Sequence, residues 1–199
     1  SDPRIESVVA VYTGKGSMGS GFYILPDVVL TNWHVVDKSK FVEMKRFDRH
    51  ETFGRVMVKD VRLDLALIKV QERGVPVRFR TRRTVDLGAT VEAIGHPFRR
   101  EFSITRGIVS TVREEKTINL PRGGGEPVLY IQTDAPTNPG NSGGPLFLGD
   151  EVIGVNTMGI RADVGEGQNF AVHYSEILRF IEETFPGYRA RMAGKEKTS

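Results

Sequence analysis

The sequence predicts an all-β fold in two strand-rich halves, followed by one C-terminal α-helix. Short runs of apolar and β-branched residues recur through most of the 199-residue chain, and Gly, Pro and Asp separate them, as at Leu25-Pro26-Asp27. Helical periodicity is clear in one segment near the C-terminus. Regular short strands of this kind are typical of a closed barrel or a sandwich.

The strands are predicted in two groups. The first comprises residues 8–12, 21–25, 28–31, 41–47, 52–59 and 65–70. The second comprises residues 90–94, 104–112, 128–132, 145–147, 151–157 and 170–172. Residues 71–87 are rich in arginine and have little periodicity, so they are interpreted as the connection between the halves. The corresponding domains are residues 1–87 and 88–199.

The C-terminal helix is predicted over about residues 175–185. Ser175 is the expected N-cap, because its hydroxyl can accept a hydrogen bond from a first-turn N–H. Apolar residues then repeat at helical spacing, at Ile177, Leu178, Ile181 and Phe185. Pro186-Gly187 is the expected stop, and the polar tail from Arg189 to Ser199 is expected to be frayed.

Charge and hydropathy narrow the classes of partner. The chain has 28 basic and 25 acidic residues, a net charge of +3, which gives no reason to expect a nucleic acid or a membrane surface. The dense basic run at Arg78, Arg80, Arg82 and Arg83 is interpreted as a solvated connecting loop. No stretch reaches the ~18 apolar residues of a membrane span, and the N-terminus lacks a signal-peptide pattern.

Metal sites and cofactors are not expected. The chain contains no cysteine, which excludes disulfides and thiolate ligands. The four histidines, His34, His50, His96 and His173, show no ligand spacing. His50 lies in a charged stretch and is expected to be a solvated turn residue.

A candidate nucleophile lies in Gly140-Asn141-Ser142-Gly143-Gly144-Pro145-Leu146. A serine hydroxyl is a poor nucleophile at neutral pH, so it needs a base and a site for the developing oxyanion. Glycines around Ser142 permit a tight turn that aims backbone N–H groups at one point. The N–H groups of Gly140 and Ser142 are the candidate donors, and the predicted oxyanion hole comprises Gly140, Asn141 and Ser142. Without further motifs, these residues could equally be a glycine-rich turn before a strand.

A candidate base and a candidate acid each lie at the end of an apolar strand. His34 follows the apolar run that ends at Thr31, and a rigid strand end is a good mount for a base. Asp64 opens the run 65–70 and could be either a surface strand cap or a buried carboxylate that orients the histidine. Burial of that carboxylate requires hydrogen bonds, and a histidine N–H would supply one.

These segments, in the order His34, Asp64, Ser142, resemble the chymotrypsin superfamily and more narrowly the HtrA/Deg serine proteases. The segments that carry the resemblance extend from about residue 19 to residue 172. They are Gly19-Ser20-Gly21-Phe22, Leu30-Thr31-Asn32-Trp33-His34-Val35-Val36, Asp64-Leu65-Ala66-Leu67, Gly95-His96-Pro97-Phe98, Gly107-Ile108-Val109-Ser110, Ile131-Gln132-Thr133-Asp134-Ala135, Asn138-Pro139-Gly140-Asn141-Ser142-Gly143-Gly144-Pro145-Leu146, Val152-Ile153-Gly154-Val155-Asn156 and Asn169-Phe170-Ala171-Val172.

The resemblance implies two six-stranded antiparallel β-barrels with a triad of His34, Asp64 and Ser142 in the cleft between them. It implies a serine endopeptidase that acts on unfolded or misfolded proteins in the bacterial periplasm or cell envelope, and a possible homotrimer. Relatives commonly carry a PDZ domain after the protease, and the residues after the predicted helix are too few for one.

The resemblance also implies a specificity pocket, formed by Pro136, Thr137, Gln168, Asn169, Phe170 and Ala171. The family pattern differs here at His96, where Asn is usual, and at Pro136-Thr137 and Gln168-Asn169. In trypsin-like enzymes an aspartate lies six residues before the nucleophile, and Pro136 occupies that position. The pocket is therefore not expected to favour Arg or Lys, because it would bury a cation without a carboxylate.

Two other functions fit part of the sequence. An α/β-hydrolase esterase would use Ser142, Asp163 and His173 in that order, but its fold alternates strands with long helices. A non-catalytic binding or chaperone module could use a protease scaffold, although such proteins usually lose a triad residue. Labelling of Ser142 by a serine-reactive probe would separate an enzyme from a binding module.

Overall fold

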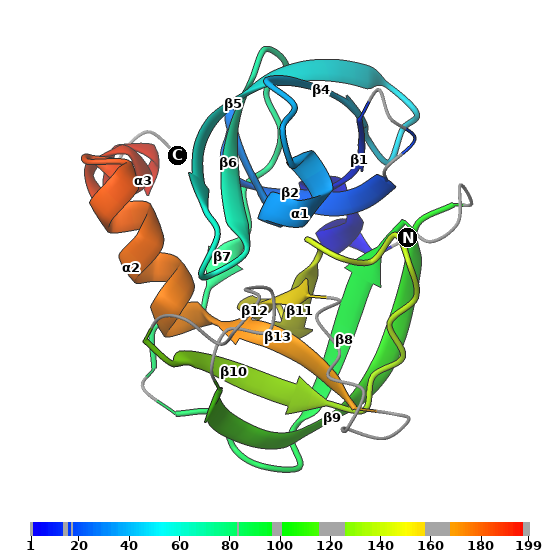
Figure 1. The fold of residues 1–199 in the computed structure, drawn as a ribbon, viewed down its shortest axis with the longest axis vertical. Helices are drawn as coiled ribbons and strands as arrows, with labels where there is room; N and C mark the ends of the chain where they lie inside the picture. The colour runs from blue at the N-terminus through cyan, green and yellow to red at the C-terminus, as the bar shows by residue number, and fades with distance from the viewer. Residues whose placement is uncertain are drawn as a thin grey trace.

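The first half of the chain forms a closed six-stranded antiparallel barrel in the computed structural model (Figure 1). The structure describes residues 2–13, 16, 18–82, 84–96, 101–115, 126–157 and 168–196, with side chains through residue 192. In spatial order the barrel strands are β1 (Val8–Tyr12), β2 (Met18–Leu25), β3 (Val28–Thr31), β6 (Leu65–Val70), β5 (Glu51–Asp60) and β4 (Phe41–Lys45), and β4 pairs with β1 to close it. Alternate residues of β4 are buried, as the pleat of a half-buried strand requires.

The second half forms the second barrel. Its strands, in spatial order, are β11 (Pro145–Leu148), β8 (Thr90–Gly95), β9 (Ser103–Glu115), β10 (Val128–Thr133), β13 (Asn169–His173) and β12 (Glu151–Thr157). Pairing of β11 with β12 closes this barrel. The prediction of two six-stranded antiparallel barrels is confirmed, and every strand predicted from the sequence overlaps an observed one.

The connecting segment contains one strand that the sequence analysis missed. The strand β7 (Arg78–Phe79) lies parallel to β12, with Arg78 opposite Glu151 and Phe79 opposite Val152. Two residues are too few to show a period of two, so no pattern could reveal the strand. The domain boundary between residues 87 and 88 stays a prediction. The strand β7 belongs to the predicted domain of residues 1–87, but it pairs with the sheet of the second barrel.

Four helical segments accompany the strands in the described part of the chain. They are a 3₁₀-helix (Pro3–Ser7) and the α-helices α1 (Trp33–Val36), α2 (Tyr174–Thr184) and α3 (Tyr188–Glu196). The predicted helix corresponds to α2, but the N-cap is His173 and not Ser175, because the His173 side chain accepts from the Ser175 N–H at 3.0 Å.

The expectation of a frayed tail is wrong for residues 189–196, which belong to α3 (Tyr188–Glu196). Tertiary contacts stabilise this helix despite its polar sequence. Tyr188 is 5% exposed, and Arg191 pairs with Asp27 of the first barrel at 2.6 Å and lies over the Phe185 ring. Burial alone would raise the pKa of Asp27, but hydrogen bonds from Lys69 and Arg191 outweigh it and hold the pKa below its ordinary value.

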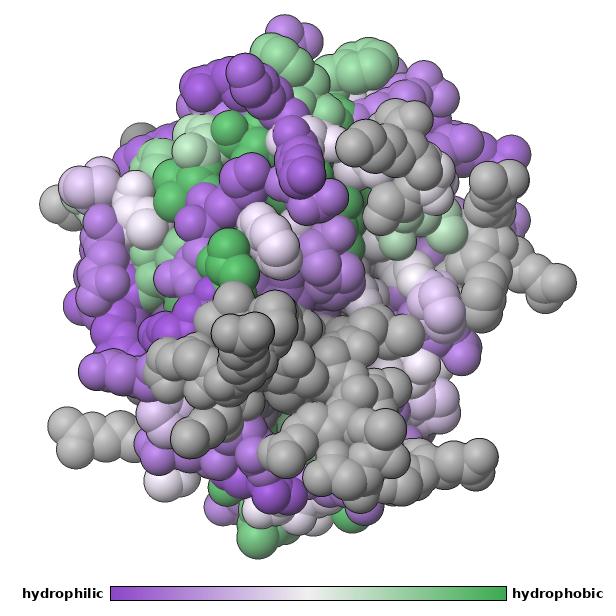
Figure 2. Space-filling view, viewed as in Figure 1, coloured by the Kyte–Doolittle hydropathy of each residue, from purple (hydrophilic) through white to green (hydrophobic). Residues whose placement is uncertain are grey.

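The hydrophobic core extends through both barrels. Its larger cluster joins Phe22 and Leu30 of the first barrel to Ile94, Phe147 and Ile177 of the second half. Figure 2 shows that hydrophilic residues cover most of the described surface on one face, with hydrophobic residues between them. The part of the chain that the structure describes contains no helix long and apolar enough to cross a membrane.

Candidate active site

The candidate site lies where the two barrels meet. His34 is on α1, at the side of the first barrel that faces the second (Figure 1), and Asp64 lies in the turn between β5 and β6. Ser142 lies in the loop between β10 and β11 of the second barrel. The backbone N–H of Ser20 on β2 donates to the Ser142 carbonyl at 2.8 Å, so the nucleophile loop is attached directly to the first barrel.

Asp64 binds His34 through both carboxylate oxygens. Its Oδ2 lies 2.6 Å from His34 Nδ1, and its Oδ1 accepts from the His34 backbone N–H at 2.8 Å. Asp64 is 1% exposed, whereas the His34 side chain is 37% exposed. With the carboxylate as partner, Nδ1 carries the hydrogen and Nε2 keeps a lone pair that can take a proton. The prediction that Asp64 is a buried, hydrogen-bonded carboxylate and not a surface cap is confirmed.

The backbone around Asp64 is held as firmly as its side chain. Asp64 adopts a left-handed conformation with φ 56° at the end of a turn in which the Leu63 N–H donates to Asp60 Oδ1 at 2.9 Å. The Asp64 carbonyl accepts from Asn32 Nδ2 at 2.9 Å and from the Trp33 N–H at 3.1 Å. The residues before His34 therefore hold the main chain of the acid, while the acid holds the His34 ring.

Thr157 is a contact of the acid that sequence reasoning missed. Its Oγ1 donates to Asp64 Oδ2 at 3.1 Å, and both residues are buried. Thr157 ends β12, so this bond comes from the second barrel. A threonine at the end of a β-strand is ordinary, and the sequence therefore offered no signal for its role.

Ser142 lies close to α1 but makes no hydrogen bond to His34 in this structure. It is 3% exposed, and its Oγ has no hydrogen-bond partner among the described residues. A Cβ placed on Gly19 would lie 2.5 Å from Val35 and 2.9 Å from the Ser142 carbonyl. Gly19 therefore lies between the Val35 side chain and the Ser142 backbone, and the space there is too small for any larger residue. Catalytic hydrogen bonds are often long in unliganded sites and shorten when substrate binds.

The loop before Ser142 presents two free amides. Gly140 has φ 102°, a conformation that favours glycine. The N–H groups of Gly140 and Ser142 donate to no acceptor within the described ranges. Asn141 donates its N–H to the Asn138 carbonyl at 2.9 Å, so that amide is not free for an oxyanion. The Asn141 side chain is 1% exposed and packs against Gly95.

The two predicted segments of the specificity pocket lie together. Asn169 Nδ2 donates to the Ala135 carbonyl at 2.8 Å, next to Pro136. Gln168 Oε1 accepts from Gln132 Nε2 at 2.9 Å, and Thr137 is half-buried. Phe170 and Ala171 lie in the hydrophobic core at 1% and 0% exposure.

The other three histidines are used elsewhere. His96 is 7% exposed, burial lowers its pKa, and its backbone N–H donates to Ser20 Oγ at 2.9 Å. His50 is exposed as expected and pairs with Glu72 at 2.8 Å. His173 caps α2, and burial lowers its pKa to about 4. Asp163, the other residue of the esterase alternative, lies outside the described residues, and the observed barrels exclude the α/β-hydrolase fold. Within the described chain, no group of three or more His, Cys, Asp or Glu side chains could hold a metal ion.

Comparison with known proteins gives consistent matches. A family model described as a trypsin-like peptidase domain matches residues 19–155. A probable periplasmic serine endoprotease DegP-like of Ectopseudomonas mendocina (strain ymp) is 42% identical over 171 residues, covering 84% of this chain and 35% of that protein. Serine protease HTRA1 of Xenopus tropicalis is 39% identical over 176 residues, covering 83% of this chain and 36% of that protein. The chain thus spans about a third of the length of these relatives.

The fold also matches the folds of solved protease structures. The serine endoprotease from Yersinia pestis superimposes with a TM-score of 0.75 at 28% identity, covering 90% of this chain and 63% of that chain. An inactive mutant form of Rv3671c from M. tuberculosis H37Rv gives a TM-score of 0.79 at 26% identity, covering 92% of each chain.

Proposed function

Because the chain belongs to the trypsin-like peptidase domain family and, within it, to the HtrA/Deg serine proteases, we propose that it hydrolyses peptide bonds through an acyl-enzyme on Ser142. The observation that carries this proposal is the 2.6 Å contact between His34 Nδ1 and the buried Asp64 carboxylate. A solvent-shielded carboxylate on one ring nitrogen leaves the other nitrogen as a base, which is the arrangement that activates a serine.

The proposed reaction uses this chain's residues in two half-reactions. His34 Nε2 takes the proton of Ser142 Oγ while Oγ bonds to the carbonyl carbon of the substrate. The N–H groups of Gly140 and Ser142 bind the resulting oxyanion. His34 then gives its proton to the leaving amine as the C–N bond breaks. His34 then takes a proton from a water molecule that attacks the acyl carbon, and it gives this proton to Ser142 Oγ as the ester bond breaks and the acid leaves.

Two experiments test the proposal: labelling with a fluorophosphonate probe, and then digestion of denatured casein. The native chain should be labelled and should digest casein, while Ser142→Ala should lose labelling and roughly 10⁴–10⁶ in turnover. Ser110→Ala is the matched control, since Ser110 is exposed on β9 and should behave as the native chain. Casein digestion by purified Ser142→Ala at the native rate would refute the assignment.

A non-catalytic binding module is the second candidate, and one observation favours it. Ser142 Oγ is buried and has no hydrogen-bond partner within the described structure, so the nucleophile is not aligned with His34 here. This candidate would be supported if no fluorophosphonate labels the native chain and if the substitution Ser142→Ala leaves the affinity for unfolded protein unchanged.

Substrate, compartment and assembly are further parts of the proposal. Unfolded polypeptides are the proposed substrates, on the strength of the family resemblance. Several relatives are named periplasmic, which supports a periplasmic or cell-envelope location. The homotrimer follows from the family resemblance alone. Fractionation of the native host and light scattering of the purified chain check location and assembly.

A further inference from the structure

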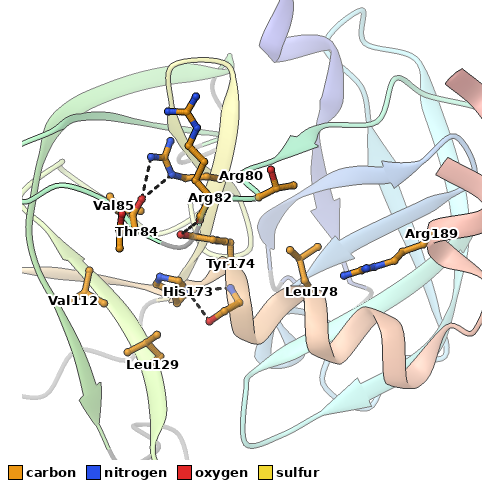
Figure 3. Close-up of a pocket in the computed structure, with 12 residues that line it drawn as sticks. Arg80, Arg82, Thr84, Val85, Val112, Leu129, His173, Tyr174, Leu178 and Arg189 are labelled. Carbon is orange, nitrogen blue, oxygen red and sulfur yellow. Dashed lines mark hydrogen bonds between the residues drawn. The ribbon is translucent and has the colours of Figure 1, made fainter. Parts of the chain in front are cut away.

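Two buried histidines lie outside the proposed triad, and their rings are used differently. The His173 ring caps α2, because its Nδ1 accepts from the Ser175 N–H at 3.0 Å, and it stacks on Tyr174 (Figure 3). His96 is 7% exposed, and its Nδ1 is buried with no hydrogen-bond partner among the described residues. A buried polar atom without a partner costs free energy. An apolar ring would avoid this cost, which points to a use for the His96 imidazole beyond packing.

The His96 ring lies between side chains of the two barrels. It packs edge-on against Tyr12 of β1 in the first barrel, with ring centroids 6.4 Å apart. It also packs edge-on against Phe102 in the second half, with centroids 5.2 Å apart. Gly95 at the end of β8 pairs with Ser103 at the start of β9, so His96 and Phe102 continue this pairing by one residue. The ring therefore connects β1 to the end of the β8–β9 pair.

The first barrel also holds the main chain of His96. The His96 N–H donates to Ser20 Oγ on β2 at 2.9 Å. Ser20 lies opposite Ala10 of β1, and Tyr12 follows Ala10 by two residues, so the side chains of Ser20 and Tyr12 project from one face of the β1–β2 pair. One face of the first barrel thus holds both the ring and the backbone of His96.

His96 is linked to the nucleophile loop, residues 138–142, by two routes. Ser20 Oγ accepts from His96 and gives its own hydrogen to the Gly140 carbonyl at 2.6 Å. The residue before His96, Gly95, lies against Asn141, because a Cβ on Gly95 would be 2.5 Å from Asn141 Oδ1. A displacement of His96 would therefore disturb two supports of the loop that carries the candidate oxyanion donors.

The surroundings of His96 favour the neutral ring. The charged side chains of β4 on this face are Lys45, opposite Ala10, and Glu43, which is opposite Tyr12 and exposed. Burial lowers the pKa of His96 below its ordinary value, and the Lys45 ammonium acts in the same direction. A protonated ring carries a hydrogen on both nitrogens, and Nδ1 has no acceptor in the described part of the chain. Protonation therefore favours movement of the ring out of its site.

We propose that the neutral His96 ring positions the nucleophile loop, and that mild acid releases the loop by displacing this ring. His96 is a positioning residue, because it acts through Ser20 and Gly95 and touches no reacting atom. The effect on turnover rests on the proposed function. The movement of the loop does not, so it can be tested in a protein that lacks the proposed base.

The kinetic test compares the native chain with His96→Phe, which keeps a ring but cannot titrate. The ratio of native kcat to variant kcat on a fluorogenic peptide should fall at least about threefold between pH 7.5 and pH 5, because only the native chain releases its loop. The fall should begin below pH 6.5, the ordinary pKa of histidine, since burial lowers the pKa of His96. The ratio of KM values should stay constant, because the loop acts on the oxyanion and not on ground-state binding. Both proteins contain His34, so its titration cancels in each ratio.

His50→Gln is the matched control. His50 also titrates, but it is exposed, pairs with Glu72 and has no contact with the nucleophile loop. The ratio of native kcat to the kcat of this variant should not change with pH.

Nuclear magnetic resonance tests the movement of the loop without proteolysis. In His34→Gln protein, the His96 ring Cε1–H signal and the Gly140 amide signal should move between pH 7.5 and pH 5 with one common midpoint. Addition of His96→Phe should abolish the movement of the Gly140 signal. These signals do not depend on an active enzyme, so failure of this proposal is distinguishable from absence of fluorophosphonate labelling at Ser142.

Several outcomes would overturn the proposal. A constant ratio of native kcat to His96→Phe kcat from pH 7.5 to pH 5 would show that His96 does not control the loop. Equal movement of the Gly140 signal with and without His96→Phe would assign that movement to another group. If His96→Phe does not fold, judged by circular dichroism, the His34→Gln protein decides alone. Separate midpoints for His96 and Gly140, or a His96 ring that does not titrate before the protein unfolds, would then exclude the proposal.

Discussion

Ser20 Oγ donates a 2.6 Å hydrogen bond to the carbonyl oxygen of Gly140. The same oxygen of Ser20 accepts from the His96 N–H at 2.9 Å, and the Ser20 N–H donates to the Ser142 carbonyl at 2.8 Å. One fully buried residue of the first barrel therefore fixes the main chain on both sides of Asn141, within the loop that presents the two free amides.

Ser20→Ala should lower kcat by roughly tenfold to a hundredfold with KM nearly unchanged, because the loop that carries the Gly140 and Ser142 amides loses a bond to the first barrel. The loss also leaves a buried carbonyl and a buried N–H unpaired, which costs about 1–3 kcal/mol. Thr31→Val is the matched control. It removes the 2.7 Å bond from Thr31 Oγ1 to the Ser20 carbonyl and should cost stability but little turnover. Equal kcat in the two variants would show that Ser20 has only a structural role. Steady-state kinetics on a fluorogenic peptide and urea unfolding measure both effects.

Thr157→Val should lower kcat by about tenfold while KM stays the same, since Asp64 Oδ2 loses a donor that acts on His34 and not on substrate. Thr157→Ser should restore most of the activity, because it keeps the hydroxyl. Thr52→Val is a suitable control, as Thr52 is equally buried and its hydroxyl has no partner among the described residues. A proportional rise in KM would instead place Thr157 in substrate binding.

Cleavage should follow small or medium apolar residues and not Arg or Lys. The described residues 135–137 and 168–171 include no carboxylate, so a buried cation would be unpaired and costly. The nearby Asp134 is exposed and engaged with the Ile108 N–H at 2.8 Å, and Asp134→Asn should leave the preference unchanged. Mass-spectrometric mapping of cuts in a denatured protein checks this, and dominant cuts after Arg or Lys would contradict it.

His173 should make the protein less stable in mild acid. Its pKa is lowered by burial from 6.5 to about 4, so below pH 6.5 the unfolded chain binds a proton that the native ring does not. The contribution of the neutral His173 ring to the free energy of unfolding is fully present above pH 6.5 and is lost as the pH falls towards 4. The loss between pH 7.5 and pH 5 is about 2 kcal/mol. His173→Asn keeps an N-cap acceptor but cannot titrate. Urea unfolding at the two pH values should show a smaller difference for this variant, and an equal difference would exclude His173 as the cause.

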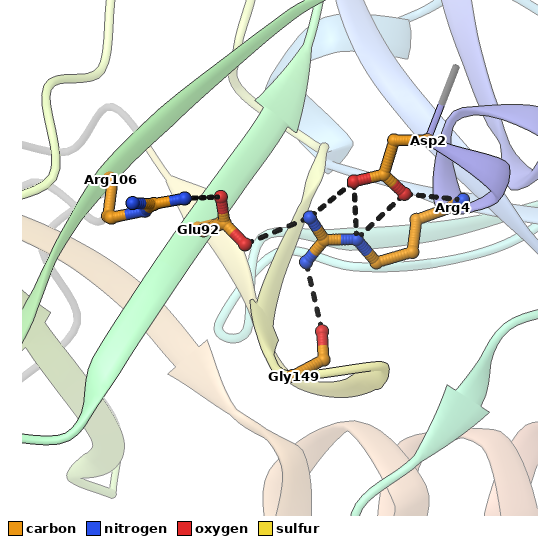
Figure 4. Close-up of polar contacts among 5 residues, drawn as sticks. All are labelled: Asp2, Arg4, Glu92, Arg106 and Gly149. Atoms are coloured by element: carbon orange, nitrogen blue, oxygen red, sulfur yellow. Dashed lines mark hydrogen bonds and ion pairs between the residues drawn. The ribbon is translucent and has the colours of Figure 1, made fainter.

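Arg4 should stabilise the protein by anchoring the N-terminal 3₁₀-helix to the second barrel (Figure 4). Its guanidinium binds Asp2 at 2.6 Å, Glu92 at 2.9 Å and the Gly149 carbonyl at 2.9 Å, and it lies over the Phe147 ring. Arg4→Gln should lower the free energy of unfolding by about 1–2 kcal/mol, because these partners lose a half-buried cation. The exposed ion pair of Arg78 with Asp150 serves as the comparison. Arg78→Gln should change the free energy of unfolding by under ~0.5 kcal/mol. Equal losses would indicate that the Arg4 contacts are ordinary surface pairs.

Periodicity and turn residues were sufficient to predict the strands of both barrels, and the family resemblance pointed to the pairing of His34 with Asp64. Alternation and turn residues located β1, β3, β6 and β12 to the residue. The rest depends on contacts between distant segments. The strand β7 exists because β12 is beside it, and α3 exists because Arg191 reaches Asp27. Ser20 and Thr157 are ordinary strand residues in the sequence, and only the docking of two barrels gives their hydroxyls a role.

The short run from Val77 to Arg80 connects both barrels through main-chain hydrogen bonds. The Val77 N–H donates to the Tyr23 carbonyl of β2 at 2.9 Å, and the Arg80 N–H donates to the Val152 carbonyl of β12 at 3.0 Å. This linker cannot act as a hinge, because a rotation of one barrel relative to the other would break its main-chain hydrogen bonds to one of the two barrels. We therefore expect the two barrels to denature together in a single transition, and we expect a proteolytic nick at residues 81–87 to yield two fragments that stay bound to each other under native conditions.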